Sequence, residues 1–146
     1  MSGFVTKVMV NKPVGHTFRL FLDEEIMAQW VSGFKAIEIL SGKPRTADSL
    51  YRMLIHFNGE DFQIYQKLLE VEKDERVHVQ MEHPEFITYS EIMFSKSGLS
   101  TEMLCKVKIE GKNVKMKLAM PLVKSVLESR NEKDYLVFKK IAEKKR

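Results

Sequence analysis

The sequence has little cysteine, proline and glycine, and it lacks any long hydrophobic run. Its 146 residues include one cysteine, Cys105, which excludes an internal disulfide and a metal site made of cysteines alone. No stretch approaches the roughly 20 apolar residues that span a membrane. Residues 1–7 also lack the basic start and apolar block of a signal peptide. We therefore expect no membrane span and a cytoplasmic protein.

Several catalytic and cofactor motifs are absent as well. The sequence contains no P-loop, no Gly-x-Gly-x-x-Gly fingerprint and no Gly-x-Ser-x-Gly elbow that would activate a serine. Its histidines, His16, His56, His78 and His83, show no zinc-type spacing with one another or with Cys105. We expect no metal, no cofactor and no catalytic residue that the sequence alone identifies.

Charge is distributed unevenly along a chain of globular composition. Apolar residues make up 44% and charged residues 30%, which indicates one folded domain over residues 1–146. From Met103 onward 13 residues are basic and 5 are acidic. A basic end attracts nucleic acid or anionic lipid. We favour a solvated helix face and no nucleic-acid partner, because the aromatic–basic interleaving of a single-strand binder is missing.

Alternating apolar residues predict an antiparallel sheet. A strand over 4–11 is followed by two short helices, over 14–22 and 23–31. The period then becomes two, and turn residues separate six further strands, over 34–40, 50–57, 62–71, 76–82, 86–95 and 101–109. The segment 62–71 does not alternate cleanly, which a β-bulge would explain.

The C-terminal part of the sequence predicts one long helix. Its apolar residues recur at helical spacing, and the helix starts at about Pro121, or at Val114 with a kink at the proline. The polar stretch 129–134 weakens the apolar stripe of this helix. It is the only element long enough to cover the sheet, and a strongly curved sheet wrapped on a helix leaves space for a ligand. The fold class is therefore α+β.

The order of these elements and several local motifs resemble the helix-grip superfamily. The matching residues are the strand entering a proline at 10–14, Trp30, Gly42, Gly98 with Thr101, and the closing-helix segments 116–122 and 132–140. This superfamily, the SRPBCC grouping, contains the START lipid-transfer domains, the birch-pollen-allergen-like proteins, and the polyketide cyclase/dehydrase and lipid-transport proteins. The resemblance implies a seven-stranded curved antiparallel sheet, two short helices after strand 1 and a long C-terminal helix. It also implies an internal hydrophobic cavity, but no single reaction.

Nine methionines and fourteen aromatic residues supply side chains for either a core or a cavity. Methionine adapts to variable shapes, but a core face and a cavity face look alike in a sequence, so both readings stay open. Glu91 is a candidate acid or base if its strand face points inward and a surface residue if it points outward. The candidate cavity residues are Trp30, Tyr51, Met53, Ile55, Tyr65, Val79, Met81, Tyr89, Glu91, Met103, Cys105 and Met120.

Three functions fit these observations. The first is the binding of a hydrophobic small molecule, such as a lipid, a polyketide or an isoprenoid, between the sheet and the last helix. The second is an enzyme of the polyketide cyclase/dehydratase type, in which the cavity folds a reactive chain. The third is an interaction module like the chaperone-regulating branch of the superfamily, acting through its outer surface. We favour a non-catalytic binding protein with a hydrophobic ligand as its partner.

Overall fold

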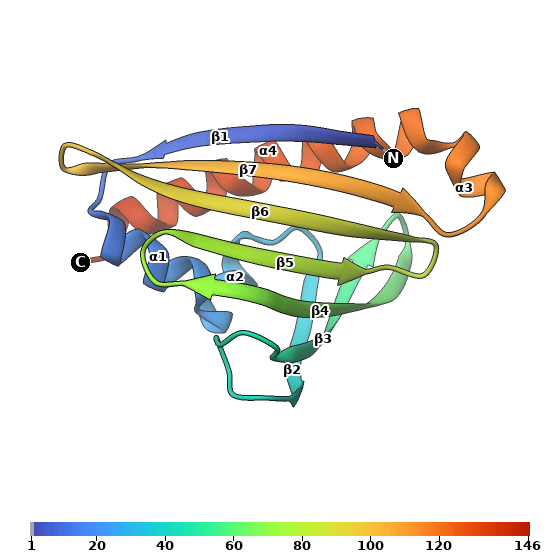
Figure 1. Ribbon diagram of the computed structural model, residues 1–146, viewed down its shortest axis with the longest axis horizontal. Coiled ribbons are helices and arrows are strands. Elements are labelled where there is room, and N and C mark those ends of the chain that lie inside the picture. The colour runs from blue at the N-terminus through green and yellow to red at the C-terminus, as the bar shows by residue number, and fades with distance from the viewer. Residues whose placement is uncertain (1) are drawn as a thin grey trace.

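The computed structural model describes residues 2–146, which form a curved antiparallel sheet of seven strands and four helices (Figure 1). This is the predicted α+β helix-grip architecture, with two short helices after strand 1 and a long C-terminal helix. No helix in this part of the chain is both long and apolar enough to cross a membrane. The elements are β1 (Ser2–Val10), α1 (Val14–Leu22), α2 (Glu24–Trp30), β2 (Phe34–Ser41), β3 (Leu50–Phe57), β4 (Glu60–Glu72), β5 (Arg76–Glu82), β6 (Phe86–Ser97), β7 (Ser100–Gly111), α3 (Val114–Leu118) and α4 (Met120–Lys144).

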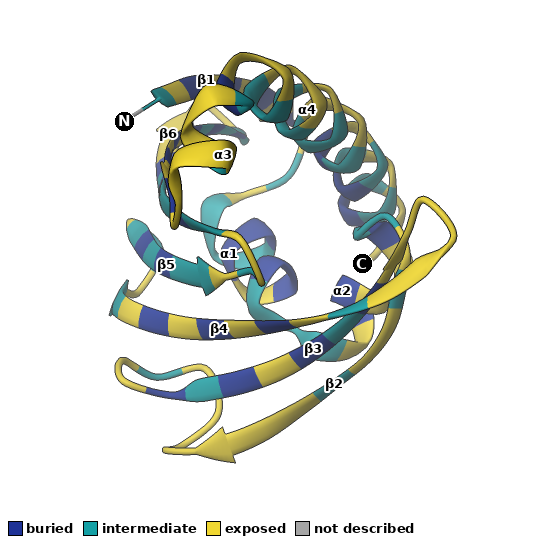
Figure 2. Cartoon of the chain, turned by 90° about the vertical axis from the view of Figure 1, so that its right-hand side faces the viewer, coloured by how far each residue is buried: buried dark blue, intermediate teal, exposed yellow. Residues whose placement is uncertain are grey.

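The strands lie in the order β1-β7-β6-β5-β4-β3-β2, and every neighbouring pair is antiparallel. Figure 2 shows the sheet curling so that its inner face turns toward the helices, and α4 lies along β1. The other edge strand, β2, is largely exposed, and its pairing with β3 shifts register twice, between Phe34 and Ala36 and between Ile39 and Ser41. The helices therefore cover one side of the sheet and leave β2 open.

Local sequence signals fix the chain reversals. Asn58 and Gly59 both have positive φ angles, 53° and 83°, as a two-residue hairpin between β3 and β4 requires. Gly33, with φ of 71°, lies in the turn between α2 and β2, where the chain passes close to β3. A Cβ atom at this position would lie 2.0 Å from the carbonyl oxygen of His56, so only glycine fits.

Two irregular segments can be compared with the predictions. The register between β4 and β5 shifts between Leu68 and Glu70, so the bulge predicted in this strand is confirmed. The C-terminal segment is not one kinked helix, because α3 and α4 are separate helices that meet at Ala119. Pro121 lies in the first turn of α4, where its missing N–H costs no helical hydrogen bond.

Buried aromatic rings fill one end of the space between the sheet and α4. Phe138 is fully buried, and its ring centre lies 5.6 Å from that of Phe21 and 5.5 Å from that of Trp30, both edge to face. Such pairs add about 0.5–1.5 kcal/mol each beyond the burial of their area. We call this set the aromatic cluster, and its members are Phe18, Phe21, Trp30, Phe94, Tyr135 and Phe138.

Candidate functional site

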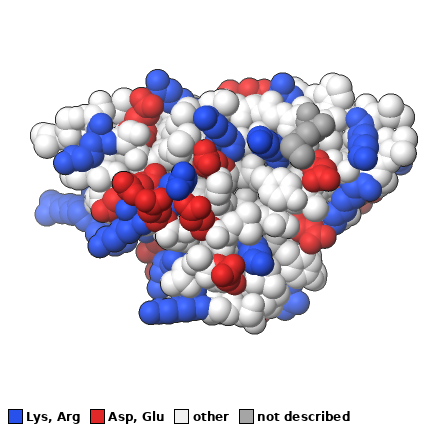
Figure 3. All heavy atoms as spheres, viewed as in Figure 1, with Lys and Arg blue, Asp and Glu red and all other residues white. Residues whose placement is uncertain are grey.

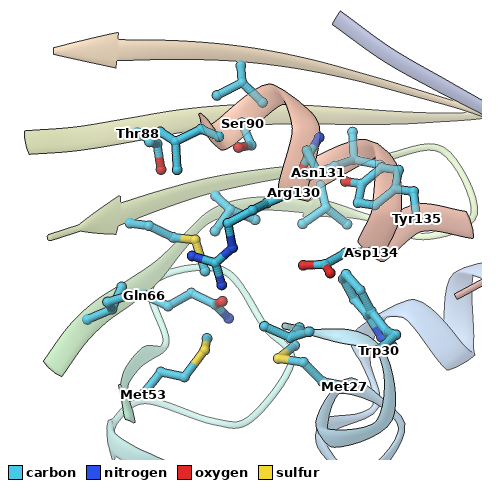
Figure 4. Close-up of a pocket in the computed structure, with 18 of the residues that line it drawn as sticks. Met27, Trp30, Met53, Gln66, Thr88, Ser90, Arg130, Asn131, Asp134 and Tyr135 are labelled. Carbon is cyan, nitrogen blue, oxygen red and sulfur yellow. The ribbon is translucent and has the colours of Figure 1, made fainter. Parts of the chain in front are cut away.

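Beside the aromatic cluster, the space between the sheet and the helices is hollow. A cavity of about 190 Å³ lies between the inner face of the sheet and helices α2 and α4 (Figure 4). Its wall is mostly apolar, with side chains from β3 to β6 facing α2 and α4. Trp30, Phe21 and Tyr135 belong to both the cluster and the wall, so they separate the filled end from the hollow one.

The sheet wall of the cavity follows from strand alternation. Met53 and Ile55 of β3, and Val79 and Met81 of β5, each stand two positions apart and line the cavity together. Side chains two residues apart share one face of a strand, so each pair points inward together. This regular arrangement builds a broad apolar wall opposite α4.

The helix wall carries three polar residues from neighbouring positions on α4, in addition to the polar residues of the sheet wall. The Asp134 carboxylate accepts hydrogen bonds from the backbone N–H of Ser32, at 3.2 Å, and from its hydroxyl. Arg130 donates to the Ser32 carbonyl oxygen at 2.8 Å, and Asn131 donates to the Thr6 hydroxyl at 3.0 Å. These bonds tie α4 to the chain after α2 and to β1, and they leave polar atoms at the cavity surface.

Two groups beside the cavity are held uncharged by burial. Burial raises the pKa of the Cys105 thiol, and hydrogen bonds from Tyr135 and Asn131 only partly oppose this effect. Burial also raises the pKa of Tyr135 well above its ordinary value, helped by the neighbouring Cys105. Cys105 and Tyr135 are therefore neutral at physiological pH.

His83 lies at the end of β5 and lines the cavity. Its ring stacks on Phe86, with ring centres 4.2 Å apart. Burial, together with the positive charges of Arg130 and Lys112, lowers the pKa of His83 to about 4. His83 is therefore a neutral imidazole at physiological pH, in a part of the cavity where the surrounding charge is positive.

The predicted site residues fall into three groups. Trp30, Met53, Ile55, Val79 and Met81 line the cavity. The indole N–H of Trp30 is buried and has no hydrogen-bond partner in residues 2–146, so ring packing alone holds this side chain. That these five residues contact a ligand is part of the proposal below.

A second group is buried but lies outside the cavity. Tyr51 is 3% exposed, and its hydroxyl accepts a hydrogen bond from the backbone N–H of Arg45 at 2.8 Å. Met103, Cys105 and Met120 are packed into the core and do not line the cavity. These four side chains are therefore part of the packed core and not of the cavity wall.

A third group requires correction. Tyr65, Tyr89 and Glu91 were expected in the cavity, but they lie on the outer face of the sheet. Ser90 lines the cavity, so its neighbours on β6 must point the other way. Glu91 is paired there with His78, with an oxygen–nitrogen distance of 2.8 Å. Of the two alternatives for Glu91, the structure therefore supports a surface residue and not an acid or base in the cavity.

Sequence reasoning missed the polar residues of the cavity. On α4 they lie in the polar stretch that interrupts the apolar stripe of the helix, so this interruption was the available signal. On the sheet they occupy inward positions between apolar neighbours, as Gln66 does between Ile64 and Leu68. The missed residues are Gln66, His83, Thr88, Ser90, Arg130, Asn131 and Asp134.

The part of the chain that the structure describes contains no group of three or more His, Cys, Asp or Glu side chains that could hold a metal ion. Among the residues that line the cavity in this part of the chain, Asp134 is the only carboxylate. It already accepts the hydrogen bonds of Ser32. The arrangement therefore offers a surface for apolar contact with polar groups along α4.

Comparison with known proteins identifies the fold. No family model and no curated protein sequence matches this chain. Among solved structures, it is similar to the Zhui aromatase/cyclase from a Streptomyces species, with 13% identity, 97% and 93% of the two chains covered, and a TM-score of 0.84. It is similar to a START superfamily protein from Mycobacterium smegmatis, with 16% identity, 97% of each chain covered and a TM-score of 0.81.

A third similar structure is Ara h 8.0201, with 9% identity and a TM-score of 0.70. The alignment covers 93% of this chain and 97% of Ara h 8.0201. At such identities the likeness concerns the backbone only. Because START and aromatase/cyclase structures share the whole arrangement of strands and helices, this chain has the helix-grip fold expected from its sequence.

Proposed function

We propose that this protein binds a small hydrophobic molecule in the cavity between the sheet and α4. The observation that carries the proposal is the cavity itself, whose mostly apolar wall encloses about 190 Å³ beside an otherwise tightly packed core. Protein interiors are normally close-packed, so an apolar wall that is left uncovered in a partly open pocket is unfavourable. A ligand that fills it recovers this free energy by burying apolar surface.

The size of the cavity limits the ligand. An engineered apolar cavity of about 150 Å³ holds benzene, whereas sites for drug-sized ligands enclose roughly 300–1,000 Å³. With about 190 Å³, this cavity fits a molecule of one or two rings or an isoprenoid of similar size. Among the ligand classes considered from the sequence, this size favours a compact ring system over a long lipid chain.

Binding is favoured over a cyclase or dehydratase reaction because the acid–base candidates named from the sequence lie outside the cavity. Of the groups that line it, Asp134 is engaged by Ser32, and burial keeps the Tyr135 phenol neutral. Glu91, Tyr65 and Tyr89 point away from the cavity, and Tyr51 is occupied by the backbone of Arg45. A general acid or base must come within hydrogen-bond reach of the reacting atom. None of these four side chains does so from its observed position.

Naphthalene and a cavity-filling variant test the proposal. Trp30 is the one tryptophan of the sequence and lines the cavity, so its fluorescence reports occupation of the site. Saturable quenching by naphthalene is expected for the unmodified protein, and Ser90→Phe should weaken it at least tenfold because the new ring occupies the cavity. Ser95→Phe is the matched control, since Ser95 is an exposed serine of the same strand.

The proposal fails if naphthalene does not bind, or if Ser90→Phe binds it as well as the control does. Circular dichroism must show that both variants remain folded. Native mass spectrometry of protein purified from its own host then identifies the natural ligand, which should be a compact apolar molecule. A turnover assay on that molecule separates a carrier from an enzyme, because a carrier returns it unchanged.

A further inference from the structure

Arg130 is the least expected residue in the wall of the cavity. It lies in the middle of α4, is half-buried, and points toward the side of the cavity where Gln66 and Met53 lie (Figure 4). A guanidinium carries a permanent positive charge and five N–H donors. Placing such a group beside apolar side chains is costly unless an opposite charge pairs with it.

The protein itself provides no such charge. Arg130 donates one hydrogen bond, to the carbonyl oxygen of Ser32, and its guanidinium carbon lies 4.7 Å from the centre of the Phe57 ring. No carboxylate within residues 2–146 forms an ion pair with it. The carboxylate one turn further along α4, Asp134, is held by Ser32 instead. Arg130 therefore keeps free donors and an uncompensated charge at the cavity wall.

Two further observations agree with a site for a negative charge. Gln66, on the sheet wall, is 6% exposed and lines the cavity, and Figure 4 shows its side chain on the side toward which Arg130 points, so its amide offers a second donor there. After burial, the charges of Arg130 and Lys112 also lower the pKa of His83, which agrees with an excess of positive charge beside this part of the cavity. Lys112 forms an ion pair with Glu82, with a nitrogen–oxygen distance of 2.8 Å. Of these two basic residues, Arg130 is therefore the one without an ion-pair partner in residues 2–146.

We propose that the ligand of this cavity is an apolar acid of one or two rings, whose carboxylate binds the Arg130 guanidinium while its rings contact the apolar wall. The inference rests on the proposed binding function and specifies the ligand class for the same site. Arginine suits this role because its planar donors match the two oxygens of a carboxylate. Apolar contact then supplies affinity, and Arg130 selects acids over neutral molecules of the same shape.

A pair of probes that differ only in charge tests the inference. 2-Naphthoate and 2-naphthamide share the ring system, and both can be titrated calorimetrically, with Trp30 fluorescence confirming the site. Hydrogen bonds to charged groups are stronger than those to neutral groups, and the difference corresponds to about a tenfold higher affinity for the charged probe. We expect the unmodified protein to bind 2-naphthoate at least tenfold more tightly than 2-naphthamide.

Variants of Arg130 locate the source of this preference. Arg130→Gln should reduce the ratio of the two affinities to about one, mainly by weakening the binding of 2-naphthoate. Arg130→Lys should keep a reduced preference, because it retains the charge without the planar donors. The control is Arg52→Gln, since Arg52 lies on an exposed part of β3 and pairs with Glu38, and its preference should be unchanged.

The outcomes separate this inference from the proposed function. If both probes bind equally to the unmodified protein, or if Arg130→Gln keeps the preference, the inference is wrong while the binding function stands. If neither probe, nor naphthalene, binds at Trp30, both are wrong. Thermal unfolding of each variant shows whether a lost preference reflects lost folding, and Arg130→Lys decides the question if Arg130→Gln does not fold.

A separate inference concerns the outer surface where α3 meets α4. Four apolar residues spaced by four positions face solvent there, with exposed fractions of 72% for Val114, 79% for Leu118, 70% for Leu122 and 37% for Val126. Figure 2 shows α3 as an exposed helix, and Figure 1 shows it projecting at one end of the molecule. Single exposed apolar residues are ordinary, but four of them within residues 114–126, two on α3 and two on α4, indicate a binding surface, and we call these four residues the stripe.

Charge around this stripe indicates what binds. The segment 111–127 contains four lysines and no acidic residue. In Figure 3, basic side chains lie beside uncharged atoms at the end of the molecule where α3 lies, and acidic side chains lie further inward on the same face. An apolar helix face bordered by lysines is the arrangement that places a helix in the interface of an anionic bilayer. We infer that the α3–α4 surface docks onto anionic lipid bilayers.

Vesicle sedimentation tests this inference. The protein should sediment with phosphatidylcholine vesicles that contain phosphatidylserine, much less with phosphatidylcholine alone, and less as salt rises. The pair Leu118→Ser and Leu122→Ser should abolish sedimentation, and Lys117→Gln should weaken it about fivefold. Leu99→Ser is the control, because Leu99 is 87% exposed in the β6–β7 turn, at the other end of the molecule.

Equal binding to both kinds of vesicle, or the same loss in Leu99→Ser, would overturn the inference. So would a protein that ignores vesicles and forms a dimer abolished by the two leucine substitutions, because the stripe would then be an interface between copies of the chain. Neither result bears on the cavity, so the two inferences stand or fall separately.

Discussion

Truncation of Phe138 tests whether the aromatic cluster holds α4 against the sheet. Phe138 is fully buried, and its ring packs edge to face on Phe21 and Trp30. Replacing a buried phenylalanine by alanine typically costs about 3–5 kcal/mol, including the cavity left behind. Because both ring pairs are lost here, we expect Phe138→Ala to lower the free energy of unfolding by about 4 kcal/mol, against a total of roughly 5–15 kcal/mol for a domain.

Urea unfolding measures this change, with Trp30 fluorescence and far-ultraviolet circular dichroism as independent probes. With a slope of about 2 kcal/mol per molar urea, the midpoint should fall by about 2 M. Leu136→Ala is the matched control, because Leu136 lies on the same helix but is 54% exposed. It should change stability by no more than about 0.5 kcal/mol. A loss below about 1 kcal/mol in Phe138→Ala, or an equal loss in both variants, would refute the reasoning.

Three further predictions concern single side chains. Burial lowers the pKa of His83 to about 4. Between about pH 6.5 and pH 4, His83 is therefore protonated in the unfolded chain but not in the folded protein. The free energy of unfolding falls as the pH decreases through this range. His83→Gln should remove up to about 1.4 kcal/mol per pH unit of this dependence in urea titrations, and parallel curves for both proteins would contradict it. Cys105, whose pKa burial raises, should resist iodoacetamide in the native protein and react once urea unfolds it; mass spectrometry checks this, and rapid native labelling would count against burial. The Asp23 carboxylate accepts the N–H of Glu25 at 2.9 Å at the start of α2, so Asp23→Ala should cost about 1 kcal/mol, while Asp23→Asn should cost less; equal losses in thermal unfolding would rule out a capping role.

The sheet could be predicted from the sequence because its inner positions are marked by strict alternation. In β7, Thr101, Met103, Cys105, Val107 and Ile109 are all buried, as their period of two requires. The turns are marked just as locally. The helix-grip architecture then follows from the order of the elements, because one long helix is left to cover one curved sheet.

The cavity could be predicted only in part, because core and cavity walls present the same apolar pattern. Met53 of β3 and Met103 of β7 are both fully buried, yet of these two only Met53 lines the hollow. The difference lies across the space, where Phe138 and the other rings of the aromatic cluster fill the part opposite the C-terminal half of α4, and Arg130, in the middle of α4, lines the hollow part. The alternation within a strand does not determine which part of a helix packs opposite that strand, because this depends on the tertiary structure.

The irregular pairing of β2 affects how readily this protein associates with other copies of itself through its sheet edge. An edge strand presents unpaired N–H and C=O groups that can template a strand from another molecule. β1 is covered by α4, but β2 is exposed along most of its length. Its two register shifts interrupt the row of free backbone groups, and Lys35 and Glu38 add exposed charges along it. The open edge is therefore a poor template for strand addition, which protects the protein from edge-to-edge aggregation without a covering helix.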